Sequence, residues 1–98
     1  LPKLEYLADR VFLGLLPSSE LVWEHAVNCL KQTGGYLHIH MNVEEEKIPN
    51  WQKQTIEEIN KFAKANGRAL SVVSSNMVKV KWFSPRVRHV VLDLELRP

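Results

Sequence analysis

The hydrophobic pattern changes period along the chain in a way that predicts strands and helices in turn. A near-continuous apolar run over residues 10–16 stops at Pro17 and is typical of a strand buried on both faces. Apolar positions three or four apart then predict helices over residues 20–32 and 50–66. Ser18 or Ser19 can cap the first of these helices.

The remaining apolar segments indicate three more strands. Leu37, Ile39 and Met41 alternate with histidines within residues 36–42, and a second alternating run covers 87–96. A third strand is predicted over residues 69–78. Right-handed helical crossovers make the first three strands parallel, and the last strand then returns antiparallel. The expected fold class is α/β.

Turn residues support these boundaries. Gly34 follows the first helix and suits a left-handed closing position, while Gly67 ends the second helix. Pro49 is well placed at a helix start. The acidic residues 43–48 are expected to form a surface loop.

Length and composition narrow the class of protein. Ninety-eight residues with 45% hydrophobic content make one soluble domain at most. No window has the roughly 18 apolar residues of a membrane span, and no signal peptide is visible. The single cysteine, Cys29, fits a reducing compartment, and we expect a cytoplasmic protein. Cys29 lies in a helical apolar pattern, which favours a core thiol over a nucleophile.

Two polar features invite a chemical interpretation. His38 and His40 share one face of a strand, as metal-binding pairs do, but no Asp, Glu or Cys pattern supplies further ligands. We therefore expect a semi-buried pair and no metal. Asp93 lies inside an apolar strand, where a structural hydrogen bond or ion pair is favoured over general-base work.

Cations and aromatic side chains gather near the C-terminus, although the net charge is only +2. They are Lys79, Lys81, Trp82, Phe83, Arg86 and Arg88. Cations meet phosphates and aromatic rings stack on unpaired bases, which points to RNA. Trp82 and Phe83 could equally be core residues beneath a turn predicted over residues 79–86.

No complete active site is visible. The four glycines form no Gly-x-Gly loop after a strand, so no nucleotide cradle is present, and a Gly-x-Ser-x-Gly elbow is also missing. We assign no catalytic residue.

Four segments together resemble one enzyme family, the tRNA wybutosine-synthesising aminocarboxypropyltransferases. This second enzyme of the pathway belongs to the Met-10-like branch of class I methyltransferase folds. The segments are DRVFLGLLPSSE at 9–20, GGYLHIHMNV at 34–43, VKWFSPRVRH at 80–89 and VLDL at 91–94. The resemblance covers most of the chain in order.

The resemblance implies a particular part of a particular fold. The family sheet has seven strands, the last inserted antiparallel between the fifth and sixth. Residues 1–98 then form a single partial domain, the C-terminal half of a Rossmann-like class I methyltransferase fold with strand order 4-5-7-6. The glycine-rich S-adenosylmethionine loop and the ribose-binding acid would precede Leu1.

The implied activity of the whole protein is transfer of the 3-amino-3-carboxypropyl group of S-adenosylmethionine to a tricyclic guanine derivative beside the anticodon of phenylalanine tRNA. Two alternatives remain open. The tRNA guanine-37 N1-methyltransferases share the fold but carry Asn-Leu-Pro where this chain has Leu15-Leu16-Pro17. A non-catalytic RNA-binding module would need only the basic, aromatic segment.

By position, the resemblance also implies site residues. Gly14, Leu15, Leu16, Pro17 and Ser18 would line the pocket for cofactor and target base. The Trp82, Phe83, Ser84 and Pro85 segment would flank the base at the same end of the sheet. Lys79, Lys81 and Arg86 would meet tRNA phosphates.

Two expectations follow for the chain by itself. It should be inactive and show no detectable S-adenosylmethionine binding, because the main binding loop is missing; micromolar binding by calorimetry would contradict this. The strand at residues 10–16, central in the full sheet, becomes an edge here and should promote self-association.

Overall fold

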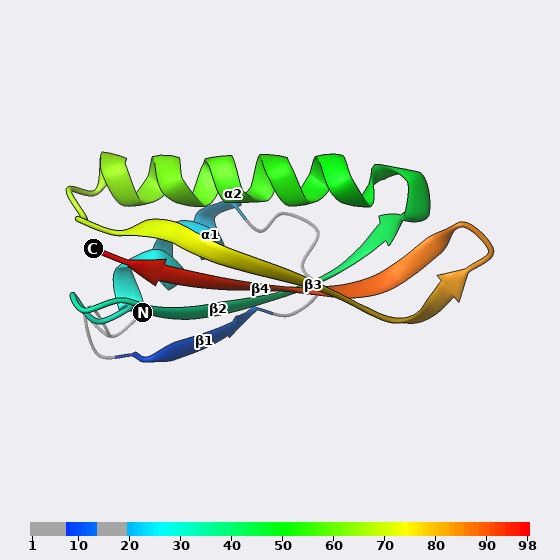
Figure 1. The fold of residues 1–98 in the computed structure, drawn as a ribbon, viewed down its shortest axis with the longest axis horizontal. Helices are drawn as coiled ribbons and strands as arrows, with labels where there is room; N and C mark the ends of the chain where they lie inside the picture. The colour runs from blue at the N-terminus through cyan, green and yellow to red at the C-terminus, as the bar shows by residue number, and fades with distance from the viewer. Residues whose placement is uncertain (1–7, 14–19) are drawn as a thin grey trace.

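A computed structural model describes residues 8–13 and 20–98 of the chain. Its elements run along the chain in the predicted order (Figure 1). They are β1 (Arg10–Leu13), α1 (Glu20–Cys29), β2 (Gly35–Glu44), the 3-10 turn η1 (Glu45–Lys47), α2 (Ile48–Ala65), β3 (Ser71–Ser84) and β4 (Val87–Arg97).

The strands form one mixed sheet in the order β1-β2-β4-β3. β1 pairs parallel with β2, and β4 lies between β2 and β3, antiparallel to both. The insertion of the last strand between its two predecessors was predicted, and so were all four strand directions. The positions 14–16 of the first predicted strand lie outside the described residues.

Both helices cover the same face of the sheet. Val27 of α1 and Ile59 of α2 are fully buried in one cluster with alternate residues of the strands. The strand residues of that cluster are Leu13, Leu37, Ile39, Leu92, Leu94 and Leu96. The opposite face carries the histidines, as the alternation in residues 36–42 predicted. None of the helices in the described part of the chain could span a membrane.

The predicted turn at residues 79–86 is wrong. β3 continues to Ser84 and only Pro85 and Arg86 form the turn. β-Branched residues such as Val78 and Val80 favour extended backbone, and pairing with β4 prolongs the strand. The alternative that Trp82 and Phe83 are core residues is also wrong.

β3 is an irregular edge strand. Its register with β4 shifts at three places, between Val72 and Ser74, Lys79 and Lys81, and Trp82 and Ser84. Each shift leaves one residue without an opposite partner, as in a β-bulge. Val73, Val80 and Phe83 occupy these positions and are exposed. Bulges twist an edge away from regular pairing with another chain.

Two positions join α1 to the rest of the fold. Gly34 has φ +101°, as its predicted left-handed role requires, and a Cβ there would lie 2.1 Å from the Leu96 carbonyl oxygen. The buried Arg68 donates through Nη1 to the Val27 carbonyl oxygen and through Nη2 to that of Leu30, each at 2.6 Å. These carbonyls end a helix and need donors.

We predict that Asn60→Ala lowers the free energy of unfolding by about 1 kcal/mol. Asn60 Oδ1 accepts a hydrogen bond from the Val72 backbone N–H at 2.8 Å, linking α2 to the start of β3. Urea titration measures the change. Lys61→Ala, on the same helix and exposed, is the control and should stay within about 0.5 kcal/mol of the parent. Equal losses for both variants would contradict the role of the amide.

Candidate functional site

The carboxyl ends of β1, β2 and β3 lie at one edge of the sheet, and the β3–β4 hairpin projects beyond it (Figure 1). Leu13, the last residue of β1, lies opposite Ile39, but β2 continues to Glu44. Those five residues span roughly 16 Å. The tip of the hairpin is therefore well beyond the end of β1.

Glu45 holds the hairpin in place from η1. Its backbone N–H donates to the Arg86 carbonyl oxygen at 2.8 Å. Its carboxylate pairs with Lys79 Nζ at 2.9 Å and with Arg88 Nε at 2.5 Å. The Lys79 ammonium lowers the pKa of the Glu45 carboxyl, burial opposes this, and Arg88 lowers the pKa further. The carboxylate is thus the fixed centre of two ion pairs.

Trp82 is the aromatic member of this arrangement. The Arg88 guanidinium lies 3.8 Å from the centre of the Trp82 ring. Trp82 as a whole is nevertheless 50% exposed. It lines a pocket of about 340 Å³ beside the turn of the hairpin. The full lining is Glu44, Glu45, Glu46, Trp82, Pro85 and Arg86.

The other residues predicted for the site are distributed as follows. Gly14, Leu15, Leu16, Pro17 and Ser18 lie outside the described residues. Lys81 faces the side of the sheet away from the helices, in register with His89. Phe83 is 66% exposed at a bulge, and Ser84 ends β3. The hairpin thus brings the predicted aromatic and basic residues together at one tip.

The helix-free face carries a second polar arrangement. Arg10 Nη1 lies 3.1 Å from His38 Nε2, and His38 Nδ1 lies 2.7 Å from Asp93 Oδ1. Because a guanidinium only donates, His38 Nε2 accepts and Nδ1 carries the hydrogen bound by Asp93. The predicted structural partner of Asp93 is thus His38. Phe12 stacks on the same imidazole at 4.6 Å between ring centres.

His40 forms a separate chain with β4. His89 Nδ1 lies 3.1 Å from Asn42 Oδ1, and His89 Nε2 lies 3.3 Å from His40 Nδ1. The amide oxygen accepts, so His89 Nδ1 donates and Nε2 accepts from His40. In residues 8–13 and 20–98, no three His, Cys, Asp or Glu side chains converge as a metal site requires.

We predict that His89 makes folding stability depend on pH. Burial first, then the nearby His40 and Lys81, lower the pKa of His89 below its ordinary 6.5. The unfolded imidazole therefore takes up its proton at higher pH than the folded one, and stability falls as pH drops below about 6.5. Urea titrations at about pH 7.5 and 5.5 should show a smaller loss in His89→Gln than in the parent. Equal losses would contradict this.

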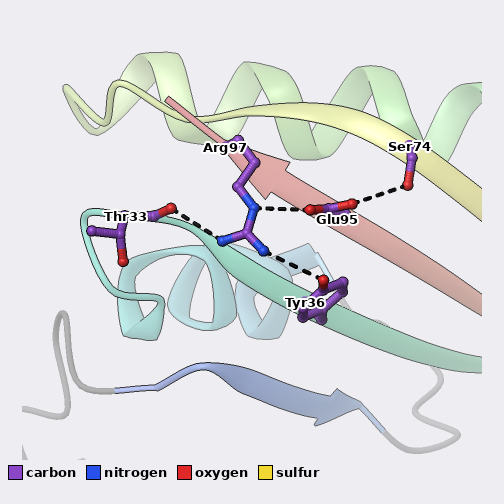
Figure 2. A network of polar contacts seen from close by, with 5 residues as sticks. All are labelled: Thr33, Tyr36, Ser74, Glu95 and Arg97. Carbon is purple, nitrogen blue, oxygen red and sulfur yellow. Dashed lines mark hydrogen bonds and ion pairs between the residues drawn. The ribbon is translucent and has the colours of Figure 1, made fainter.

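A further network lies at the opposite edge of the sheet (Figure 2). Arg97 Nε donates to Glu95 Oε2 at 2.8 Å, and the same guanidinium reaches the Thr33 carbonyl oxygen and the Tyr36 hydroxyl. Ser74 donates to the other Glu95 oxygen at 3.4 Å. The network joins β2, β3 and β4 near the C-terminus, far from the hairpin tip, and its role is structural.

Sequence reasoning missed Glu45 and Arg88 as the support of the hairpin. The run of acidic residues at 44–46 is typical of a solvated loop, and nothing local indicates partners more than thirty positions away. The sequence contains one weak signal for these ion pairs, because an acidic cluster and a basic cluster in one short chain attract each other.

Comparisons with known proteins extend this picture. No protein-family model matches the chain. The chain is 43% identical over 91 residues to the tRNA wybutosine-synthesizing protein 2/3/4 of Oryza sativa subsp. japonica, and 36% identical over 94 residues to the tRNA wybutosine-synthesizing protein 2 of Schizosaccharomyces pombe. These alignments cover 93% and 95% of this chain, but only 9% and 21% of the relatives.

Comparison with solved structures points to the same family. The crystal structure of M. jannaschii TYW2 in complex with AdoMet matches 95% of this chain and 40% of its own, with a TM-score of 0.76 and 27% identity. Trm5b from Pyrococcus abyssi, at 24% identity and a TM-score of 0.66, shares the fold. The fold is therefore the expected methyltransferase type, and the chain belongs to the family of the tRNA wybutosine-synthesizing protein 2 proteins, of which it spans a part.

Proposed function

We propose that this chain is part of the catalytic domain of an S-adenosylmethionine-dependent aminocarboxypropyltransferase that modifies tRNA. The observation that carries the proposal is the 43% identity, over 93% of the chain, to a tRNA wybutosine-synthesizing protein. The mixed sheet, with β4 inserted between β2 and β3, matches a relative that binds AdoMet. We take residues 1–98 as the C-terminal half of that domain.

The reaction exchanges one bond for another. The ring carbon of a tricyclic guanine derivative attacks the aminocarboxypropyl carbon next to the sulfonium of S-adenosylmethionine. A new carbon–carbon bond forms, the carbon–sulfur bond breaks, methylthioadenosine leaves, and the ring carbon loses its proton. The protein contributes mainly by positioning cofactor and base. A relative from P. horikoshii has been solved with MeSAdo.

We assign roles by position in the sheet. Gly14 to Ser18 come directly after β1 in the sequence, and ligands of open α/β sheets bind at the carboxyl ends of strands. By the resemblance, these residues would line the pocket for cofactor and target base. Trp82 to Pro85 would flank the target base from the hairpin. Lys79, Lys81 and Arg86 would meet tRNA phosphates. Of these cations, Lys79 is already held by Glu45.

Three further proposals complete the assignment. The substrate is phenylalanine tRNA, the tRNA on which this modification lies beside the anticodon. The protein acts in the cytoplasm, in keeping with its single cysteine, Cys29. The chain by itself associates through β1, because Phe12 is 69% exposed and only one side of this strand is paired among the described residues.

A double-label experiment tests the activity. The whole protein of which this chain is a part is incubated with phenylalanine tRNA carrying the tricyclic precursor. S-adenosylmethionine is supplied with a label either in its methyl group or in its aminocarboxypropyl carbons. We expect only the second label to enter the tRNA. Transfer of the methyl label would establish the methyltransferase alternative. Binding of tRNA without transfer of either label would favour a non-catalytic RNA-binding module.

A further inference from the structure

The pocket beside the turn of the β3–β4 hairpin has an aromatic wall that is held in position by neighbouring side chains. Glu45 holds Arg88, and Arg88 covers the Trp82 ring. Arg88 itself does not line the pocket. Trp82 therefore presents to the pocket a surface that Arg88 leaves open, and the residue is half exposed. A rigid, half-exposed aromatic ring is a stacking platform.

The charges around the pocket nearly cancel. Of the three lining carboxylates, Glu45 pairs with Lys79 and Arg88, and Glu44 pairs with Lys47 at 3.4 Å. The lining itself contributes one cation, Arg86. A free phosphate or a simple cation gains little from such a surface. A flat, neutral group with hydrogen-bond donors and acceptors fits it better.

The volume agrees with a small organic group. About 340 Å³ lies at the lower end of the range of roughly 300–1,000 Å³ typical of small-molecule sites. Unpaired RNA bases are bound in this way, by stacking on an aromatic ring and hydrogen bonding along the base edge. Carboxylates accept from the amino groups of bases, as Glu does from cytosine N4.

The pocket lies beyond the described end of β1. Leu13, the last residue of β1, pairs with Ile39 of β2. Glu44 lies five residues further along β2, a distance of roughly 16 Å. Resting on the proposed function, which places the reaction beside β1, we propose that the hairpin pocket binds an unpaired nucleobase of the tRNA that neighbours the modified base. Trp82 stacks on this base in place of flanking the modified base itself, and Glu46 accepts from its edge, while Arg86 remains a phosphate contact.

Nuclear magnetic resonance with mononucleotides tests the pocket independently of catalysis. The chain has three tryptophans, of which Trp23 is buried and Trp51 packs against the core, so the indole N–H signals act as internal references. We expect cytidine monophosphate to shift the Trp82 signal alone. Uridine monophosphate lacks the amino group and should bind about fivefold more weakly. Ribose 5-phosphate should have no effect.

Variants identify the groups involved. Trp82→Leu should weaken cytidine monophosphate binding about tenfold, and Trp82→Phe should retain most of it, because a ring remains for stacking. Glu46→Gln should remove the preference for cytidine over uridine. Glu57→Gln, an exposed carboxylate on α2, is the matched control and should change nothing.

Each outcome decides the proposal. A Trp82 signal that does not move with either nucleotide, or that moves equally with ribose 5-phosphate, overturns it. Label transfer to tRNA without nucleotide binding would leave the proposed function standing and reject the pocket. Nucleotide binding without label transfer would support the pocket and reject the proposed function.

Discussion

Replacing Arg68 by methionine will lower the free energy of unfolding by about 3 kcal/mol. The guanidinium donates to the Val27, Leu30 and Lys31 carbonyl oxygens, at 2.6, 2.6 and 3.3 Å. Methionine fills similar space but donates nothing, so carbonyl groups that end α1 are left without these hydrogen bonds. In a chain of this size, the loss corresponds to a fall in melting temperature of roughly 12–24 °C.

Two comparison variants make the test specific. Arg68→Lys keeps the charge, but a single ammonium cannot span the same carbonyls, and an intermediate loss is expected. Arg86→Met removes an exposed arginine at the hairpin turn and should change stability by less than about 0.5 kcal/mol. Chemical denaturation gives all three values. A loss below about 1 kcal/mol for Arg68→Met would show that water replaces the guanidinium.

Arg68 also shows where sequence reasoning stops. It follows Gly67 directly, where a charged residue after a helix is normally solvated. Its partners lie 37 to 41 positions earlier in the chain. Periodicity and turn residues report on neighbours within a few positions, so they locate helices and strands but give no sign of such a contact.

The strands show both what the sequence pattern predicts correctly and what it misses. Alternation placed Leu37 and Ile39 on the buried face and His38 and His40 on the other, because side chains of a strand alternate by geometry. The end of β3 was misplaced, because aromatic residues followed by Pro85 look like a turn. Pairing with β4 keeps that segment extended despite the bulges at Val80 and Phe83.

Most residues of the candidate site were predicted from the sequence, but the residues that hold them in place were not. The basic and aromatic residues of the hairpin were recognised as a group from their closeness in sequence. The pocket beside them is also lined by Glu44 to Glu46, which lie where β2 ends and η1 begins. These acidic residues lie against the hairpin because β4 is inserted antiparallel between β2 and β3. The ion pairs of Lys79 and Arg88 with Glu45 hold the hairpin there.

Reversing two hairpin charges, in the double variant Lys81→Glu and Arg86→Glu, will weaken tRNA binding roughly 100-fold at low salt. Both side chains are exposed, and neither is held by Glu45. Lys79 is left unchanged because its ammonium already pairs with that carboxylate, so its reversal would also disturb the hairpin. Filter binding over a range of salt concentrations measures the affinity.

The salt dependence distinguishes phosphate contacts from a general effect of charge. Loss of two phosphate contacts should reduce the slope of log affinity against log salt by about 1.5. The control variant, Lys53→Glu with Lys61→Glu, changes the net charge equally on the exposed side of α2. It should keep most of the affinity and the slope. If both double variants lose affinity equally, long-range attraction rather than the hairpin holds the RNA, and the tip of β3–β4 does not touch its backbone.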